Sequence, residues 1–288
     1  MGYYENFLDD IDIALTDIAS ISVTSSSKYI SGVRIAQAKT DKYKNPFTKE
    51  IIVCGNAPDD NTQYSDYFDL TLVPYELKHR PLFVHYDMSL SGDKTGIGGS
   101  WIIGKKPGTK DLYFQTAFSV SIKAPKGYQV SFEKNRQFVY WLKDHGFNVQ
   151  GISSDTFQSA DFGQSMLAKG YPYTIISVDR VNSDRICMPY HFFRSALYDG
   201  RIIMYENKLL TEEFIGLERD NNSGKIDHSP LSINTKDQAD AVVGSIYNAS
   251  QHAEEYEFEY GEDLDLIAKY NNYSTNMQIS EINTNFEQ

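Results

Sequence analysis

Three strand-like runs, separated by short polar turns, constrain the fold of this chain more than any other feature of its sequence. The runs cover residues 82–86, 97–103 and 112–122. The turns between them are rich in glycine, serine, aspartate and lysine, residues that favour a reversal of the chain. Strands joined in this way pair with their neighbours in sequence, so the segment predicts an antiparallel three-strand meander.

Helices and strands alternate after the meander. Apolar residues recur at helical spacing in segments 131–142, 159–169, 186–197, 209–218 and 237–250. Strands are expected at 147–152, 173–178 and 201–205. Alternating units of this kind build parallel strands with helices on the sheet faces. The predicted fold class is therefore α/β, with a ribonuclease H-like mixed sheet, an antiparallel three-strand meander plus parallel strands, flanked by helices.

The 288 residues divide into three predicted parts. Residues 1–80 are expected to form a linker subdomain, with a helix over residues 1–24 followed by short strands. Residues 81–250 form the ribonuclease H-like domain, and residues 251–288 form an acidic, flexible tail. The tail holds nine acids and one lysine, so it carries most of the net charge of −12. The charge of the remaining chain therefore neither excludes nor favours a nucleic-acid partner.

Several classes of protein are not expected. No apolar run approaches the ~18 residues that span a bilayer, and the N-terminus lacks the charged region and cleavage site of a signal peptide. A cytoplasmic protein, neither secreted nor membrane-bound, is the prediction. The two cysteines, Cys54 and Cys187, form no disulfide framework and no metal-ligand spacing. The chain contains no phosphate-binding loop motif, so ATP hydrolysis is not expected.

Aspartates stand where predicted strands end and where the last helix begins. Asp87 follows the first strand of the meander, and Asp155 follows the strand at 147–152. Asp237 and Asp240 open the last helix, where a spacing of three residues puts both on one face. Sites in open α/β sheets gather at the carboxyl ends of strands, so these carboxylates are expected to converge. Carboxylate oxygens suit Mg²⁺ or Mn²⁺.

Each acid also has an ordinary structural explanation. A turn explains Asp87, and a helix cap or loop explains Asp155. The helix dipole explains Asp237. Asp240 is harder to explain, because an apolar stripe follows it and a carboxylate beside such a stripe needs a partner. The order of all four acids along the chain favours a metal centre.

Five further residues are candidates for supporting roles. Asp93 lies in the first turn of the meander, where a structural role is the simpler explanation and a second-metal role the alternative. His228 precedes the last helix, in a segment that reads as a surface loop. Lys105, Lys106 and Lys110 lie between the second and third strands, where a hairpin beside the acids would contact DNA phosphates. A solvated loop is the alternative for these lysines.

Three motifs carry a resemblance to a known family. They are Asp87-Met-Ser-Leu-Ser-Gly-Asp-Lys-Thr-Gly-Ile-Gly, then Ser154-Asp-Thr-Phe-Gln-Ser, then Lys225-Ile-Asp-His-Ser-Pro followed by Lys236-Asp-Gln-Ala-Asp-Ala-Val-Val-Gly. In this order they resemble the nuclease domain of the tailed-bacteriophage terminase large subunit, in the RNase H/RuvC-like superfamily. The resemblance covers residues 10–250. It implies an Mg/Mn-dependent endodeoxyribonuclease that cuts concatemeric viral DNA during genome packaging, in the host cell cytoplasm.

The resemblance also implies roles for the acids. Asp87, Asp155 and Asp240 would be the catalytic metal ligands, with Asp237 as a further ligand or a neighbour. Which acid of the pair in the last helix is the principal ligand stays open. Together the acids would hold two divalent cations, Mg²⁺ or Mn²⁺, with Asp87 bridging them, for two-metal phosphodiester hydrolysis.

Partners follow from the same resemblance. Double-stranded DNA would be the substrate, and the portal protein, the small terminase subunit and an ATPase motor domain would be partners. The motor is absent from this chain, which would then be an isolated domain or a split gene product. Two alternatives stay open. A RuvC-like Holliday-junction resolvase, or a related strand-transfer enzyme, would prefer branched DNA, whereas a non-catalytic docking module of the packaging motor would bind without cleaving.

Overall fold

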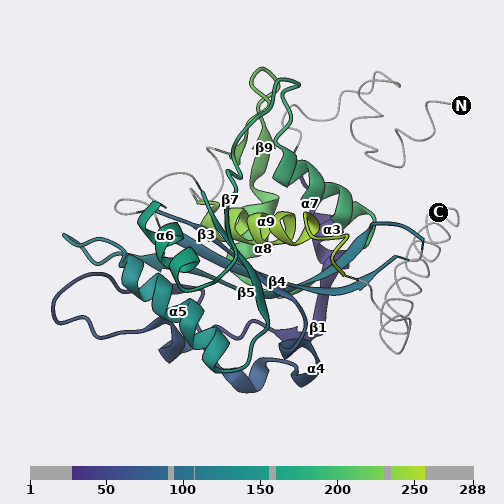
Figure 1. The fold of residues 1–288 in the computed structure, drawn as a ribbon. Coiled ribbons are helices and arrows are strands. Elements are labelled where there is room, and N and C mark those ends of the chain that lie inside the picture. The colour runs from purple at the N-terminus through teal and green to yellow at the C-terminus, as the bar shows by residue number, and fades with distance from the viewer. Residues whose placement is uncertain (1–27, 90–93, 107, 156–159, 230–234, 257–288) are drawn as a thin grey trace, which may run out of the picture.

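A mixed sheet of eight strands forms the centre of the fold (Figure 1). The computed structural model describes residues 28–89, 94–106, 108–155, 160–229 and 235–256. The strands in these ranges are β1 (Lys39–Lys44), β2 (Ile51–Val53), β3 (Leu82–Asp87), β4 (Thr95–Lys105), β5 (Leu112–Lys123), β6 (Val149–Ser154), β7 (Tyr173–Ile175), β8 (Ile202–Glu206), β9 (Leu217–Arg219) and β10 (Ile226–His228). The order across the main sheet is β1-β8-β5-β4-β3-β6-β7, β2 also pairs with β5, and β9 pairs with β10.

Helices cover both faces of this sheet. They are α3 (Gly32–Ala38), α4 (Tyr75–Lys78), α5 (Phe132–Asp144), α6 (Ala160–Ala168), α7 (Met188–Tyr198), α8 (Lys208–Ile215) and α9 (Asp237–Ser250), with 3-10 turns at Tyr64–Tyr67 and Leu70–Leu72. Residues of α5 and α6 belong to one buried cluster, and residues of α7, α8 and α9 belong to a second. In the described part of the chain, no helix has the length and apolar character needed to cross a membrane.

The pairing directions define the fold. β3, β4 and β5 are antiparallel neighbours, which confirms the predicted meander. β6 pairs in parallel with β3, and β7 in parallel with β6. An antiparallel meander whose first strand also begins a parallel set is the ribonuclease H-like arrangement, so the predicted fold class is confirmed.

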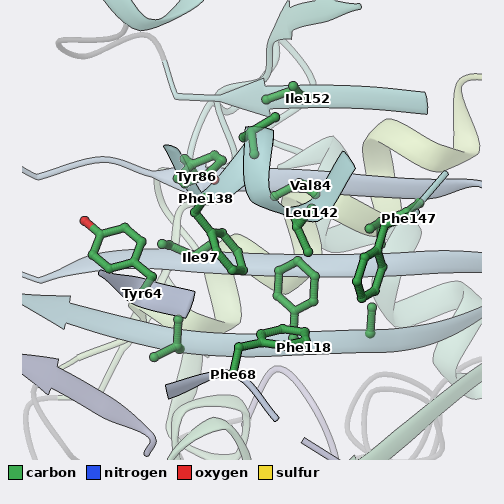
Figure 2. Packing of buried hydrophobic residues seen from close by; sticks show 14 of the residues in the cluster. Tyr64, Phe68, Val84, Tyr86, Ile97, Phe118, Phe138, Leu142, Phe147 and Ile152 are labelled. Carbon is green, nitrogen blue, oxygen red and sulfur yellow. The ribbon is translucent and has the colours of Figure 1, made fainter. Parts of the chain in front are cut away.

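Alternation along the strands divides the interior into two cores. On β3, Leu82, Val84 and Tyr86 face the α5 side, whereas Phe83 faces the α9 side. The α5 side is strongly aromatic: Phe118 and Phe138 lie 5.6 Å apart between ring centroids (Figure 2). Because side chains of a strand point alternately to opposite faces, a strand covered on both sides is apolar throughout. That requirement explains the unbroken apolar run of residues 82–84.

Two glycines of β4 allow α9 to lie directly on the sheet. A Cβ atom on Gly98 would lie 2.5 Å from the backbone carbonyl carbon of Ala241, and one on Gly96 would overlap the backbone carbonyl of Asp237. Separations this short do not occur between a side chain and a backbone, so only glycine fits at either position. The first turns of α9 are therefore held against the end of β4.

The sequence-based boundaries agree closely with the structure for the long elements. The last helix spans Asp237–Ser250, as predicted. Several departures concern short elements. Leu70–Leu72 forms a 3-10 turn, and Ile226–His228 forms a strand where a loop was expected. Gly32–Ala38 forms a helix where short strands were expected, and the helix predicted over 209–218 ends at Ile215 and is followed by β9. Strand β1 was not predicted, because its sequence Lys-Thr-Asp-Lys-Tyr-Lys lies at the sheet edge and buries too little surface to need an apolar pattern.

Some predictions for the ends of the chain lie outside the described residues. These are the helix over residues 1–24 and most of the acidic tail. Strands β1 and β2, which belong to the predicted linker subdomain of residues 1–80, pair with β8 and β5 of the main sheet. The division into parts at residues 80 and 250 stays a prediction.

The close contact between β4 and α9 is testable by one substitution. Gly98→Ala should lower the free energy of unfolding in urea by about 2 kcal/mol or more, because the added methyl group overpacks a backbone contact. Gly32→Ala is the matched control: its Cβ would be 3.7 Å from Ile215, so stability should stay the same or rise by less than about 1 kcal/mol. Equal stability of Gly98→Ala and the wild type would contradict this packing.

Candidate metal centre

Two of the predicted acids lie at the carboxyl ends of neighbouring parallel strands. Asp87 is the last residue of β3, and Asp155 directly follows β6. The backbone N–H of Asp155 donates to the carbonyl of Tyr86 at 3.3 Å, so Asp155 lies beside the residue that precedes Asp87. The parallel register of β3 and β6 therefore brings these two aspartates to one edge of the sheet.

Helix α9 adds two more acids at this edge. The backbone of Asp237, its first residue, touches Gly96, which pairs with Asp87 across the sheet. Loss of water, followed by the negative charges of Asp240 and Asp237, raises the pKa of Asp87 well above its usual range, and Lys236 opposes this shift. Three carboxylates from distant parts of the chain thus share one electrostatic environment.

Both oxygens of the Asp240 carboxylate have protein partners. The Tyr190 hydroxyl of α7 donates to Oδ1, and the Lys236 ammonium donates to Oδ2 at 2.8 Å. Asp240 is 5% exposed. Burial raises the pKa of Asp240 to about 6 despite the opposing effect of Lys236, and Asp179 contributes to the rise. Hydrogen bonds at both oxygens answer the question raised by the sequence, namely how a carboxylate beside an apolar stripe is satisfied.

Asp179 and Lys236 belong to this site, and neither was predicted. The Lys236 ammonium lies 2.5 Å from Asp179 Oδ1, in addition to its contact with Asp240. Burial lowers the pKa of Lys236, but Asp240 and Asp179 outweigh that effect and hold it above its usual value. Asp179 follows β7, so the rule that identified Asp87 and Asp155 at strand ends would also have found it.

Glu213 of α8 supports the start of α9. Its carboxylate accepts the backbone N–H of Ala239 at 2.8 Å and the hydroxyl of Thr235 at 3.2 Å. The residue at the N-cap position, Lys236, makes no side-chain cap, so Glu213 satisfies a first-turn N–H from another helix. Burial raises the pKa of Glu213 to about 8, the Ala239 bond opposes this, and Asp237 and Asp240 add to it. No local pattern marks such a long-range cap.

The remaining predicted residues have different positions. Asp93 lies outside the described residues. His228 is the last residue of β10, and its Nδ1 lies 3.0 Å from Oδ1 of Asp227. A supporting role for either residue stays a prediction.

The three lysines of the predicted DNA-contacting hairpin lie away from the acids. Asp87 pairs with Gly96 near the start of β4, whereas Lys105 is the last residue of that antiparallel strand. Lys105 donates to the backbone carbonyl of Ala253 at 3.2 Å, and Lys110 forms an ion pair with Glu254. The expected position of this hairpin, with Lys106 in its turn, beside the acids is therefore not found.

The donor set fits a hard divalent cation in its chemistry. All the acids at this edge offer carboxylate oxygens, which Mg²⁺ and Mn²⁺ prefer. In the described parts of the chain, however, no three His, Cys, Asp or Glu side chains are arranged to hold an ion as they stand. The Lys236 ammonium instead lies between two of these carboxylates, those of Asp179 and Asp240.

The strand order and the acids at the ends of β3 and β6 and at the start of α9 define a ribonuclease H-like protein with a candidate metal centre. No family model and no curated protein matches the sequence. Solved structures that are similar in fold include nuclease domains of phage large terminases.

Three comparisons illustrate the likeness. The large terminase of bacteriophage HK97 is 12% identical, with 85% of this chain and 47% of that chain covered and a TM-score of 0.48. The large terminase nuclease of thermophilic phage G20c with bound magnesium is 12% identical, with coverages of 82% and 100% and a TM-score of 0.47. The g2p nuclease domain of bacteriophage SPP1 with bound Mn is 9% identical, with coverages of 71% and 99% and a TM-score of 0.38. The chain thus spans about half the length of the HK97 protein. At identities this low, the likeness is one of fold alone.

The raised pKa of Glu213 predicts a pH dependence of stability. The folded protein holds this proton up to about pH 8, whereas the unfolded chain releases it near pH 4.5. The folded state therefore binds more protons in that window, and the free energy of unfolding falls as pH rises. In EDTA, Glu213→Gln should make this fall shallower by up to about 1.4 kcal/mol per pH unit.

Glu212→Gln is the matched control, because Glu212 is the neighbouring residue on α8 and its side chain is 43% exposed. Denaturant unfolding at a series of pH values compares the three proteins. Parallel pH profiles for the wild type and Glu213→Gln would show that Glu213 is ionised in the folded protein.

Proposed function

We propose that this chain is a metal-dependent DNA endonuclease that cuts concatemeric viral DNA during genome packaging. The observation that carries the proposal is the clustering of Asp87, Asp237 and Asp240, from β3 and α9, at the carboxyl edge of a ribonuclease H-like sheet. Burial, and then repulsion from Asp240 and Asp237, raises the pKa of Asp87, which is the cost of assembling a site for a cation. Acids with a purely structural role would not stabilise the fold by lying close together in a buried site.

Some residues would bind the cations, and others position these ligands. Asp87, Asp155 and Asp240 would hold the divalent cations, Mg²⁺ or Mn²⁺, with Asp237 as a neighbour or further ligand. When bound to such carboxylates, these ions supply activation of water and stabilisation of the leaving oxygen of a phosphodiester. Tyr190 fixes the orientation of the Asp240 carboxylate through its hydrogen bond. Glu213 fixes the first turn of α9, from which Asp237 and Asp240 project.

Lysines near the acids are the better candidates for contact with the DNA at the cleavage position. Lys94 Nζ lies 4.0 Å from the Asp237 carboxylate. Lys123 is exposed at the end of β5, next to Ile122, which pairs with Thr95 at the acidic end of β4. Phosphate contacts of this kind position a duplex without reading its sequence. Cleavage is therefore expected to show weak sequence preference.

Contact of the distant lysine hairpin with DNA also belongs to the proposal. From Gly96 to Lys105, β4 covers a length of about 30 Å. A duplex that lies along the strand and reaches both ends would extend over about nine base pairs. Lys105, Lys106 and Lys110 would then contact phosphates far from the cut, after separation of Lys110 from Glu254.

The partners and the location are part of the same proposal. An ATPase motor domain, the portal protein and the small terminase subunit would bring DNA to this domain in the cytoplasm of the host cell. Residues 81–250 would be the nuclease domain, with residues 1–80 linking it to other parts of the packaging machinery.

Cleavage of supercoiled plasmid tests the proposal. Wild-type protein should nick and linearise plasmid with Mn²⁺ or Mg²⁺ and not with EDTA, and Asp87→Ala should lose at least about 100-fold of the rate, because the central ligand is gone. Asp144→Asn is the control, since Asp144 is exposed at the end of α5. Its cleavage rate should equal that of the wild type.

Other outcomes separate the alternatives. Preferential cutting of four-way junctions over linear duplex would favour a RuvC-like Holliday-junction resolvase. DNA binding by folded wild type, without cleavage in either metal when the ATPase motor domain is also supplied, would favour a non-catalytic docking module. Equal cleavage by the wild type and Asp87→Ala would contradict the assignment of the site.

A further inference from the structure

We infer that Lys236 acts as an internal counter-ion of the candidate metal centre, and that its ammonium group has to leave Asp240 before a divalent cation can bind there. The inference rests on the proposed metal centre and adds a specific residue that controls access to it. It concerns competition between a tethered monovalent cation of the chain and a divalent cation from solution.

The contacts of Lys236 join two separate elements. Its Nζ atom lies 2.5 Å from Asp179 Oδ1, in the segment after β7, and 2.8 Å from Asp240 Oδ2, on α9. The other oxygen of Asp240 accepts the Tyr190 hydroxyl. Each oxygen of Asp240 therefore already accepts from one protein donor, and a cation at Oδ2 would share that oxygen with the Lys236 ammonium group.

The lysine is the donor that can withdraw. Tyr190 is fully buried on α7, within the aromatic core on that side of the sheet. Lys236 retains 12% exposure of its side chain, and a flexible four-carbon stem carries its charge. Asp227 of β10, whose side chain is 41% exposed and pairs with Lys225 at 2.8 Å, is a further acid whose pKa the charge of Lys236 helps to lower, after burial has raised it.

Charge and distance make the two cations exclusive. A magnesium or manganese ion binds carboxylate oxygen at about 2.0–2.2 Å, closer than the ammonium contact seen for Asp240. An ammonium group and a divalent ion that share one carboxylate oxygen at such distances repel each other strongly in a partly dry site. Binding of the ion at Asp240 is thus coupled to displacement of Lys236.

Chemical reactivity of Lys236 tests this directly on the wild-type protein. Acetylation by an amine-reactive reagent, followed residue by residue with mass spectrometry, should be slow at Lys236 without metal, because both ion pairs protect the ammonium. Saturating Mn²⁺ should raise the rate at Lys236 several-fold. Lys134 is the matched control, since it is also buried in an ion pair, with Asp60, on α5. Its rate should not respond to Mn²⁺.

Calorimetric titration with Mn²⁺ gives a second, independent measurement. Lys236→Met should bind Mn²⁺ on the order of tenfold more tightly than the wild type, because the competing charge is removed. Lys236→Arg keeps a charge at this position and should bind no more tightly than the wild type. Lys134→Met should bind with the wild-type affinity. Circular dichroism identifies variants that fail to fold, and for these the reactivity of wild-type Lys236 decides.

The outcomes distinguish this inference from the proposed function. If wild-type protein binds Mn²⁺, Asp87→Ala abolishes the binding, and the reactivity of Lys236 does not change, the inference is overturned and the metal centre stands. If neither the wild type nor Lys236→Met binds Mn²⁺, both the inference and the proposed metal centre are overturned. Faster modification of Lys236 with Mn²⁺ in the wild type, absent in Asp87→Ala, supports the inference.

Discussion

The contact between the backbones of β4 and α9 is the constraint on which the rest of the structure depends. Because Gly96 and Gly98 have no side chains, the first turns of the helix lie directly against the strand next to β3. A larger residue at either position would push the helix outward and carry Asp237 and Asp240 away from Asp87. The spacing between the acids is therefore set by two glycines that have no chemistry of their own.

This close packing creates an electrostatic problem that the surrounding residues solve. Several carboxylates are brought together with little water, which raises the free energy of their ionised forms. Hydrogen bonds from Tyr190 and Lys236 stabilise the charge on Asp240. Glu213, fully buried beneath the start of α9, stabilises its backbone as an N-cap would, and its own pKa of about 8 favours the neutral form at moderate pH. The same groups thus hold the helix and limit the repulsion at its start.

The sequence predicted the fold class, with its antiparallel meander and parallel strands, because these depend on local patterns; the assignment of the four central acids to a metal centre stays a prediction. Apolar runs, turns and strand ends can be read along the chain, and the bounds of α9 were predicted to the residue. The need for glycine at two positions of β4 could not be predicted from the local sequence, because the helix that packs against them lies more than a hundred residues later in the chain. The same is true of Lys236, whose partner Asp179 lies in the segment after β7, more than fifty residues earlier in the chain. The hairpin lysines were misplaced because antiparallel pairing puts the two ends of β4 at opposite edges.

The position of Lys236 on the chain has a quantitative consequence. It lies four residues before Asp240, at the start of the same helix, so its ammonium group stays within reach of the carboxylate even when the two are not in contact. A tethered group of this kind acts at an effective concentration that the backbone sets, in the millimolar range or above for short tethers. Dilution of the protein does not weaken it. A divalent cation therefore has to reach a fixed concentration before it displaces the ammonium group. Occupancy of the centre would then depend on the cation concentration around the protein and not on the concentration of the protein.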